Sequence, residues 1–200
     1  MPFRILRPDP ATDFLAFSLP DALATSLSAL KSLIVRSSLA ASRFSAADPD
    51  FRKIAAEADV DLIVTGTLLS AGDEIRIVAQ LTDAASGTLT FSQSMQTSIG
   101  NVFRLQDEIT ECLVNALELR LSASEQRMLR QDVPSDPKAY EYYLRANLFS
   151  NDSRQWDAAR DLYLRCVDVD PCYAPAWARL GRIYHVIAKY LPSGTKDGLQ

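Results

Sequence analysis

The segment that most constrains this chain is 177–184, which reads W-x₂-L-G-x₂-Y. The large side chains of Trp177, Leu180 and Tyr184 recur at the spacing of one helix face, with Gly181 among them. A glycine on a packing face lets a neighbouring helix approach closely, while the aromatic rings fill the remaining space. The C-terminal part of the chain is therefore predicted to consist of closely stacked helices.

This segment resembles the opening half of a tetratricopeptide (TPR) repeat, and Pro171, six residues before Trp177, falls where a preceding repeat would end. Small and aromatic residues of the preceding stretch match the same pattern. The resemblance implies one full repeat and the first helix of a second, with structural positions at Ala146, Ala159, Tyr163, Pro171, Trp177, Leu180, Gly181 and Tyr184.

The first helix of the earlier repeat fits the pattern only if one residue is inserted in the turn. That insertion would put Tyr142, Ala146 and Phe149 on the packing face, and Cys166 would occupy a further small-residue position of the second helix. The alternative is an unrelated helical hairpin.

In TPR proteins, residues of the first helix that face away from the second line a concave binding surface. Carried onto this sequence, that surface comprises Tyr140, Tyr143, Asn147, Arg182 and His185. A mixture of aromatic, amide and cationic groups suits a peptide or a carboxylate-bearing tail. The alternative is that so short a repeat segment docks on the N-terminal part of its own chain.

Upstream of residue 131, the periodicity changes between strand-like and helix-like stretches. The continuous apolar character of 61–70 predicts a central strand, and the polar composition of 89–97 predicts an edge strand. The other expected elements are a strand at 3–6, a helix at 13–30 that becomes regular at Pro20, a β-rich run at 33–36, a helix opened by Asp48 or Asp50, and a strand at 75–81.

Two N-cap signals come after the strands. Asn101 is expected to cap a long helix, and Ser122 with Glu125 has the spacing of a capping box. Two prolines within 132–137 mark the best domain boundary. We therefore expect a mixed α/β domain over 1–131, with a sheet of about five strands and packed helices, a linker at 132–137, and an all-α segment over 138–200 with helices near 137–150, 154–169 and 173–190.

With these elements placed, the first part of the chain resembles the TolB amino-terminal-like α/β domain. In bacteria that domain is followed by TPR repeats and attached to serine/threonine kinases, adenylate or guanylate cyclases, or winged-helix regulators. The matching segments run in family order: Pro2-Phe3, 13–16, Leu19, 35–38, 54–60, 65–67, 76–81, 83–87, 105–109 and 139–145. The resemblance implies a signalling context in which any chemistry resides in another domain.

Several classes of function have little support. The net charge of −4 is spread along the chain without a basic stripe, which argues against nucleic-acid binding. His185 is the only histidine, so neither a metal site nor a catalytic triad is expected. Gly66 lies within an apolar strand, where it indicates a bulge or a close backbone contact rather than a phosphate loop. No apolar run approaches the roughly 18 residues of a membrane span.

The sequence thus predicts a non-catalytic regulatory or scaffolding module that binds a protein or peptide partner through its TPR helices, with no cofactor. The alternative is a small-molecule or nucleotide sensor that uses a pocket in the α/β domain. The three cysteines lack a disulfide framework, which favours the cytoplasm, with the periplasm as the alternative if a membrane helix precedes this segment. Because Pro192-Ser193-Gly194 interrupts the helical pattern, we expect a homodimer, docking on the α/β domain, or a disordered C-terminus.

Overall fold

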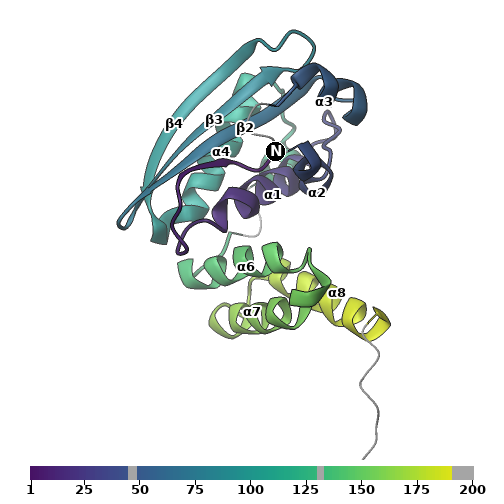
Figure 1. Ribbon diagram of the computed structural model, residues 1–200. Helices are drawn as coiled ribbons and strands as arrows, with labels where there is room; N and C mark the ends of the chain where they lie inside the picture. Colours follow the sequence, from purple (N-terminus) through teal and green to yellow (C-terminus); the bar gives the residue numbers. More distant parts are fainter. Residues whose placement is uncertain (45–48, 130–132, 191–200) are drawn as a thin grey trace, which may run out of the picture. The chain divides into compact units, whose positions relative to one another are not determined.

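The computed structural model describes residues 1–44, 49–129 and 133–190, which belong to two units, Met1–Gln131 and Asp132–Gln200 (Figure 1). The first unit combines a sheet with packed helices, and the described part of the second is helical. The predicted mixed α/β fold class is confirmed. None of the described helices is long and apolar enough to cross a membrane.

An antiparallel meander forms most of the sheet. Its strands are β2 (Leu62–Ala71), β3 (Glu74–Asp83) and β4 (Leu89–Ser98), and the short β1 (Arg4–Arg7) pairs in parallel with β2. The strand order is β1-β2-β3-β4. The predictions that β2 is internal and that β4 is an edge strand are therefore confirmed.

The described sheet has four strands, one fewer than expected, because the run at 33–36 is not a strand. Side-chain contacts fix this segment at both ends instead. The Lys31 N–H donates to the Glu125 carboxylate, and the Arg36 guanidinium donates to Asp59 over 2.9 Å. Ile34 is 88% exposed. Leu33 and Val35 are partly buried, but no described strand pairs with this run, so its β-rich composition does not form a strand.

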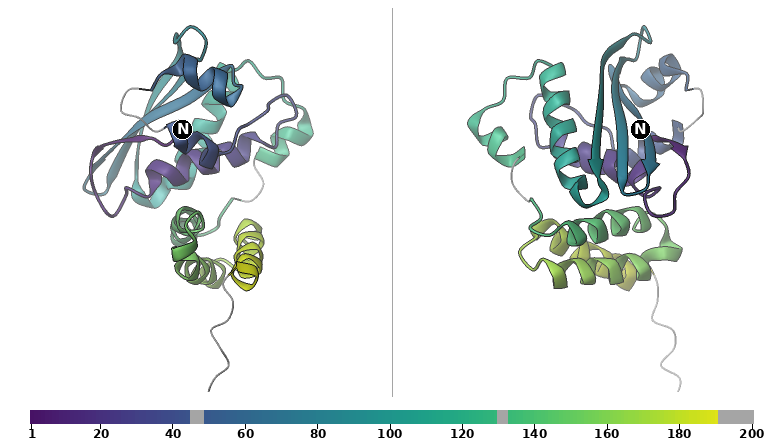
Figure 2. Two further views of the ribbon diagram at one scale, coloured as in Figure 1. Left: turned by 45° about the vertical axis from the view of Figure 1, so that its right-hand side comes forward. Right: turned by 90° about the vertical axis from the view of Figure 1, so that its left-hand side faces the viewer.

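Helices cover both faces of the sheet. Those of the first unit are α1 (Leu15–Leu27), α2 (Ser38–Ala41), α3 (Phe51–Ala58), α4 (Val102–Ala116) and α5 (Ala123–Leu129). Figure 2 (right) shows α4 and α3 on opposite sides of the strands. On the α3 side, Ile54 packs with Ile63 and Ala84 in a small apolar cluster. Apolar residues that are fully buried elsewhere in this unit include Leu15, Leu19, Leu68, Ile75, Ile77, Ala79, Leu105, Ile109 and Leu113.

Pro20 lies inside α1 rather than at its start, which corrects the expectation from the sequence. A proline in a helix has no N–H to donate to the carbonyl four residues earlier. Here that carbonyl, of Ala16, accepts instead from the backbone N–H of Phe3 over 2.7 Å. A contact from the N-terminal segment thus satisfies the group that Pro20 leaves unpaired, and the helix continues through the proline.

The expected helix caps are present in two of three described cases. Asp50 accepts from the Lys53 N–H at the start of α3, whereas Asp48 lies outside the described residues. Ser122 and Glu125 exchange reciprocal side-chain and backbone hydrogen bonds, so the predicted capping box is confirmed. Asn101 precedes α4 but makes no side-chain cap bond; its amide N–H donates to the Ser98 hydroxyl.

Three helices form the described part of the second unit: α6 (Pro137–Phe149), α7 (Trp156–Val169) and α8 (Ala174–Tyr190). Asp136 caps α6 by accepting from the Lys138 and Ala139 N–H groups, with Pro137 in the first turn. Figure 2 (left) shows the three helices nearly end-on. The remaining short elements of the chain are the 3₁₀ turns Ser42–Phe44, Ile99–Asn101 and Ser153–Gln155.

Gly66 is a point of close approach within β2. A Cβ atom built there would lie 2.6 Å from the Val78 carbonyl oxygen and 2.8 Å from the Phe3 ring. The predicted close contact at this glycine is confirmed, and it is the absence of a side chain that lets Phe3 pack against the strand.

We expect Gly66→Ala to lower the free energy of unfolding of the first unit by about 1–3 kcal/mol. The backbone at Val78 or the Phe3 ring would have to move to make room for the added methyl group. Gly100→Ala is the matched control, since nothing lies within 4 Å of a Cβ atom there. It should change stability by less than about 0.5 kcal/mol. Chemical denaturation monitored by circular dichroism measures both, and equal stability of the two variants would contradict the packing role of Gly66.

Candidate protein-binding site on the helical unit

The five residues predicted to line a binding surface fall into two groups. Tyr140, Tyr143 and Asn147 of α6 are buried, with exposed fractions of 4%, 7% and 2%. Arg182 and His185 of α8 are exposed. The two groups therefore have different surroundings, although the sequence pattern placed them on one surface.

The tyrosines of α6 belong to an aromatic cluster. Tyr140 and Tyr143 stack with ring centroids 6.1 Å apart, and Tyr173, just before α8, presents its edge to both rings. Tyr143 also lies 6.2 Å from Tyr163 of α7. Edge-to-face and offset stacked pairs are the favourable arrangements of aromatic rings. These side chains hold the three helices together.

Asn147 faces α7 rather than away from it. Its amide oxygen accepts a hydrogen bond of 2.7 Å from the Tyr163 hydroxyl, and both groups are buried. A buried amide without a partner would be costly, so this bond fixes the rotation of α6 against α7. The expectation that Asn147 faces away from the second helix of its pair is wrong.

The TPR resemblance implies a repeat of 34 residues, and the placement of Tyr143 and Asn147 agrees with that spacing. This count relates Trp177 to Tyr143 and Gly181 to Asn147, without the inserted residue that the sequence analysis assumed. The structure follows this uninterrupted count. Tyr143 and Asn147 are buried, whereas Tyr142 and Phe149 are only partly buried. Their expected place on the packing face is therefore incorrect, while Ala146 is fully buried as expected.

The same count identifies the residues of α6 that correspond to the exposed side of α8. Arg145, Leu148 and Asn151 stand 34 residues before Arg179, Arg182 and His185 respectively. Arg145 and Leu148 are partly exposed, and Asn151 is exposed. These are the positions that the sequence analysis missed. The internal repeat distance, counted back from Trp177, was the signal that identifies them.

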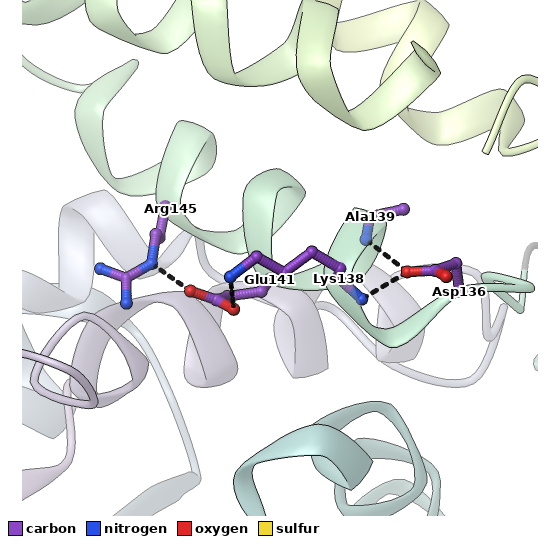
Figure 3. Close-up of polar contacts among 5 residues, drawn as sticks. All are labelled: Asp136, Lys138, Ala139, Glu141 and Arg145. Carbon is purple, nitrogen blue, oxygen red and sulfur yellow. Dashed lines mark hydrogen bonds and ion pairs between the residues drawn. The ribbon is translucent and has the colours of Figure 1, made fainter. Parts of the chain in front are cut away.

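An ion-pair network occupies this side of α6 (Figure 3). The Glu141 carboxylate pairs with Arg145 over 2.9 Å and with Lys138 over 2.8 Å. Partial burial disfavours the charged carboxylate, but the hydrogen bonds and positive charges of its two partners hold the pKa of Glu141 below its ordinary value. The positive charge of Arg145 is thus largely balanced within α6.

The corresponding side of α8 carries more positive charge. Arg179, Arg182 and His185 form what we call the α8 basic face, with Arg182 and His185 exposed and Arg179 partly so. No ion pair is recorded for Arg182 among residues 133–190. A guanidinium that is exposed and without a carboxylate partner can bind a carboxylate from another molecule.

A second side of α8 is also exposed. Trp177 is 51% and Tyr184 46% exposed, and nothing lies within 4 Å of a Cβ atom built on Gly181. The Trp177 indole N–H donates to the Pro171 carbonyl over 2.9 Å. By contrast, Ala159, Tyr163 and Cys166 of α7 are fully buried, as are Ala139 and Ala146 of α6.

The expectation for the C-terminus rested on residues 192–194, which lie outside the described part of the chain.

No group of three or more His, Cys, Asp or Glu side chains among the described residues could hold a metal ion. Cys112, Cys166 and Cys172 are free thiols. Burial raises the pKa of the Cys166 thiol to about 12, with a further contribution from the nearby Asp170 charge.

Comparison with known proteins places the chain beside a longer bacterial protein. It is 30% identical over 186 residues to a protein of Rhizobium meliloti (strain 1021) named "Putative adenylate cyclase 3", over 92% of this chain and 32% of that protein. The chain therefore spans about a third of the length of this relative. No protein-family model matches the present chain. Among solved structures, lipoprotein GNA1162 from Neisseria meningitidis is similar with a TM-score of 0.39 and 16% identity, over 61% of this chain and 96% of that one.

The paired positions 143 and 177 should differ sharply in their contribution to stability. We expect Tyr143→Ala to lower the free energy of unfolding of the helical unit by about 3 kcal/mol, because the buried ring leaves a cavity. Trp177→Ala should cost less, about 1–2 kcal/mol, because about half of Trp177 is already exposed. Thermal unfolding of the full chain, followed at helical wavelengths, tests this. A larger loss for Trp177→Ala would show that its side chain is covered.

Cysteine labelling should distinguish the two thiols of the helical unit. Iodoacetamide at about pH 8 should modify the exposed Cys172 and leave the buried Cys166 unmodified, because the thiolate is the reactive form. Addition of denaturant should make both reactive. Mass spectrometry of tryptic peptides provides the measurement, and rapid modification of Cys166 in the native chain would contradict its burial.

Proposed function

We propose that this chain is a non-catalytic regulatory module of a bacterial signalling protein, and that its TPR helices bind a protein partner through the α8 basic face. The exposure of Arg182 and His185 on one side of α8 is the observation that carries the proposal. Arg182 combines exposure with a positive charge that lacks a carboxylate partner among residues 133–190.

The similarity to a protein named as an adenylate cyclase supports the signalling context. Because the match covers 32% of that relative, we assign any cyclase chemistry to the rest of such a protein and a regulatory role to this part. The described residues offer no metal-binding cluster for a reaction centre. The three free thiols favour a reducing compartment, and we therefore place the module in the cytoplasm.

The partner chemistry follows from the side chains of the α8 basic face. Guanidinium groups bind carboxylates with two parallel hydrogen bonds, and an imidazole adds a further donor or acceptor. Leu148, at the position in α6 that corresponds to Arg182, is partly exposed and offers an apolar contact. We therefore expect the partner to present an acidic peptide segment or a C-terminal carboxylate next to an apolar residue.

The test is affinity capture from a lysate of the source organism with the full chain as bait, followed by calorimetric titration of the captured protein. Arg182→Ala combined with His185→Ala should weaken binding at least tenfold, as expected for the loss of a charged hydrogen bond of about 1.5–3 kcal/mol. Arg165→Ala is the control, because Arg165 is an exposed arginine on α7. Higher salt should weaken wild-type binding, since exposed charges are screened.

Asn147→Ala is unsuitable as a binding variant, because the Asn147 amide is buried and bonded to Tyr163. Equal capture by the wild-type chain and the double variant would contradict the α8 basic face as the binding site. That result would favour the alternative function, in which the α/β unit is a small-molecule sensor. A ligand screen that measures the melting temperature would be the next experiment, because a ligand that binds only the folded state stabilises it.

A further inference from the structure

The two edges of the sheet differ in how they are protected. β1 has four residues, two of which are arginines, and its pairing with β2 is irregular between Ile5 and Arg7. β4 has ten residues, LTFSQSMQTS, with no charged residue and no proline. Short length, charge and irregularity are the devices by which proteins keep an edge strand from pairing with another chain. β1 has all three, whereas β4 has only an irregularity, in its pairing with β3 between Leu81 and Thr82.

The outer edge of β4 is available within its unit. β4 pairs with β3 on one side, and in the described part of the first unit no other strand pairs with it. Figure 2 (right) looks toward this edge of the sheet. In an antiparallel strand, alternate residues direct their backbone N–H and C=O groups away from the paired neighbour. Of the ten β4 side chains, only that of Met95 is buried. Among the described strands, β3 alone pairs with the backbone of β4.

The sequence of β4 is compatible with pairing to itself. In an antiparallel arrangement centred on Ser94, Ser92 would lie opposite Gln96 of the second copy, and Gln93 opposite Met95. Hydroxyl and amide groups opposite each other can form hydrogen bonds, and no like charges meet. A two-fold axis brings the same surface of both molecules together, which only a self-complementary strand tolerates. This favours a second copy of the chain over an unrelated strand.

We propose that β4 is a dimerisation edge, through which two copies of this chain pair in antiparallel orientation around Ser94 and join their sheets into one continuous sheet. This site lies on the α/β unit and is independent of the binding proposed for α8. The main-chain groups of both β4 strands supply the hydrogen bonds, and their uncharged side chains permit the close approach.

Introducing a charge of either sign at Ser94, the residue on the two-fold axis, provides the test. The full chain, Ser94→Lys, Ser94→Glu and an equimolar mixture of the two variants are compared by sedimentation equilibrium over a range of concentrations. Each variant alone should dimerise at least tenfold more weakly than the wild-type chain, because like charges would meet at Ser94. The mixture should recover dimerisation, because unlike charges would then meet. Leu6→Lys adds the same charge to the opposite edge, at a residue that is 51% exposed, and should dimerise as wild type.

Hydrogen exchange identifies the strand involved. Amides of β4 that face away from β3 should exchange quickly in dilute wild-type chain and more slowly at concentrations where the dimer forms. Ser94→Lys should exchange quickly at both concentrations, while circular dichroism confirms that it remains folded. A chain that stays monomeric at about millimolar concentration overturns the proposal. So does a dimer insensitive to both Ser94 variants, or a failure of the mixture to recover.

Discussion

The hydrogen bond between Asn147 and Tyr163 decides which surfaces of the helical unit are available. It buries one side of α6 against α7, and the bond is satisfied only at one rotation of the helix. Gly181 of α8 lies 34 residues after Asn147 of α6 and is its counterpart by the repeat count. Arg182 and His185, on another side of α8, are both exposed. The buried pair thus fixes which side of α6 meets α7, while Arg182 and His185 stand on an exposed side of α8.

Much of the fold could be predicted because the relevant signals are local. Alternation of apolar residues located β3, and the reciprocal bonds of Ser122 and Glu125 are formed within a single turn. The absence of polar interruptions in β2 correctly indicated an internal strand. In each case the interaction that stabilises the element lies within the element or in its immediate neighbour along the chain.

The errors arose where a distant partner decides the outcome. Pro20 remains inside a helix because Phe3 binds the carbonyl that the proline leaves free. The run at 33–36 is not a strand; Lys31, just before it, bonds to Glu125, and Arg36 bonds to Asp59. Asn147 has the composition of a binding residue, yet Tyr163 makes it part of the interior. None of these partners is identifiable from the residue's own neighbours in sequence, although the repeat distance did contain the answer for Asn147.

The two proposed surfaces differ in physical character, and this difference suits a regulatory module. An open strand edge binds through main-chain groups, so its specificity rests on register and on the absence of like charges. The proposed α8 basic face would bind through side chains, so its specificity would rest on the placement of charge. Pairing through β4 would present two copies of the α8 basic face in one assembly. A partner with two acidic segments would then bind with an effective concentration set by the distance between the two faces, which strengthens binding without any new contact.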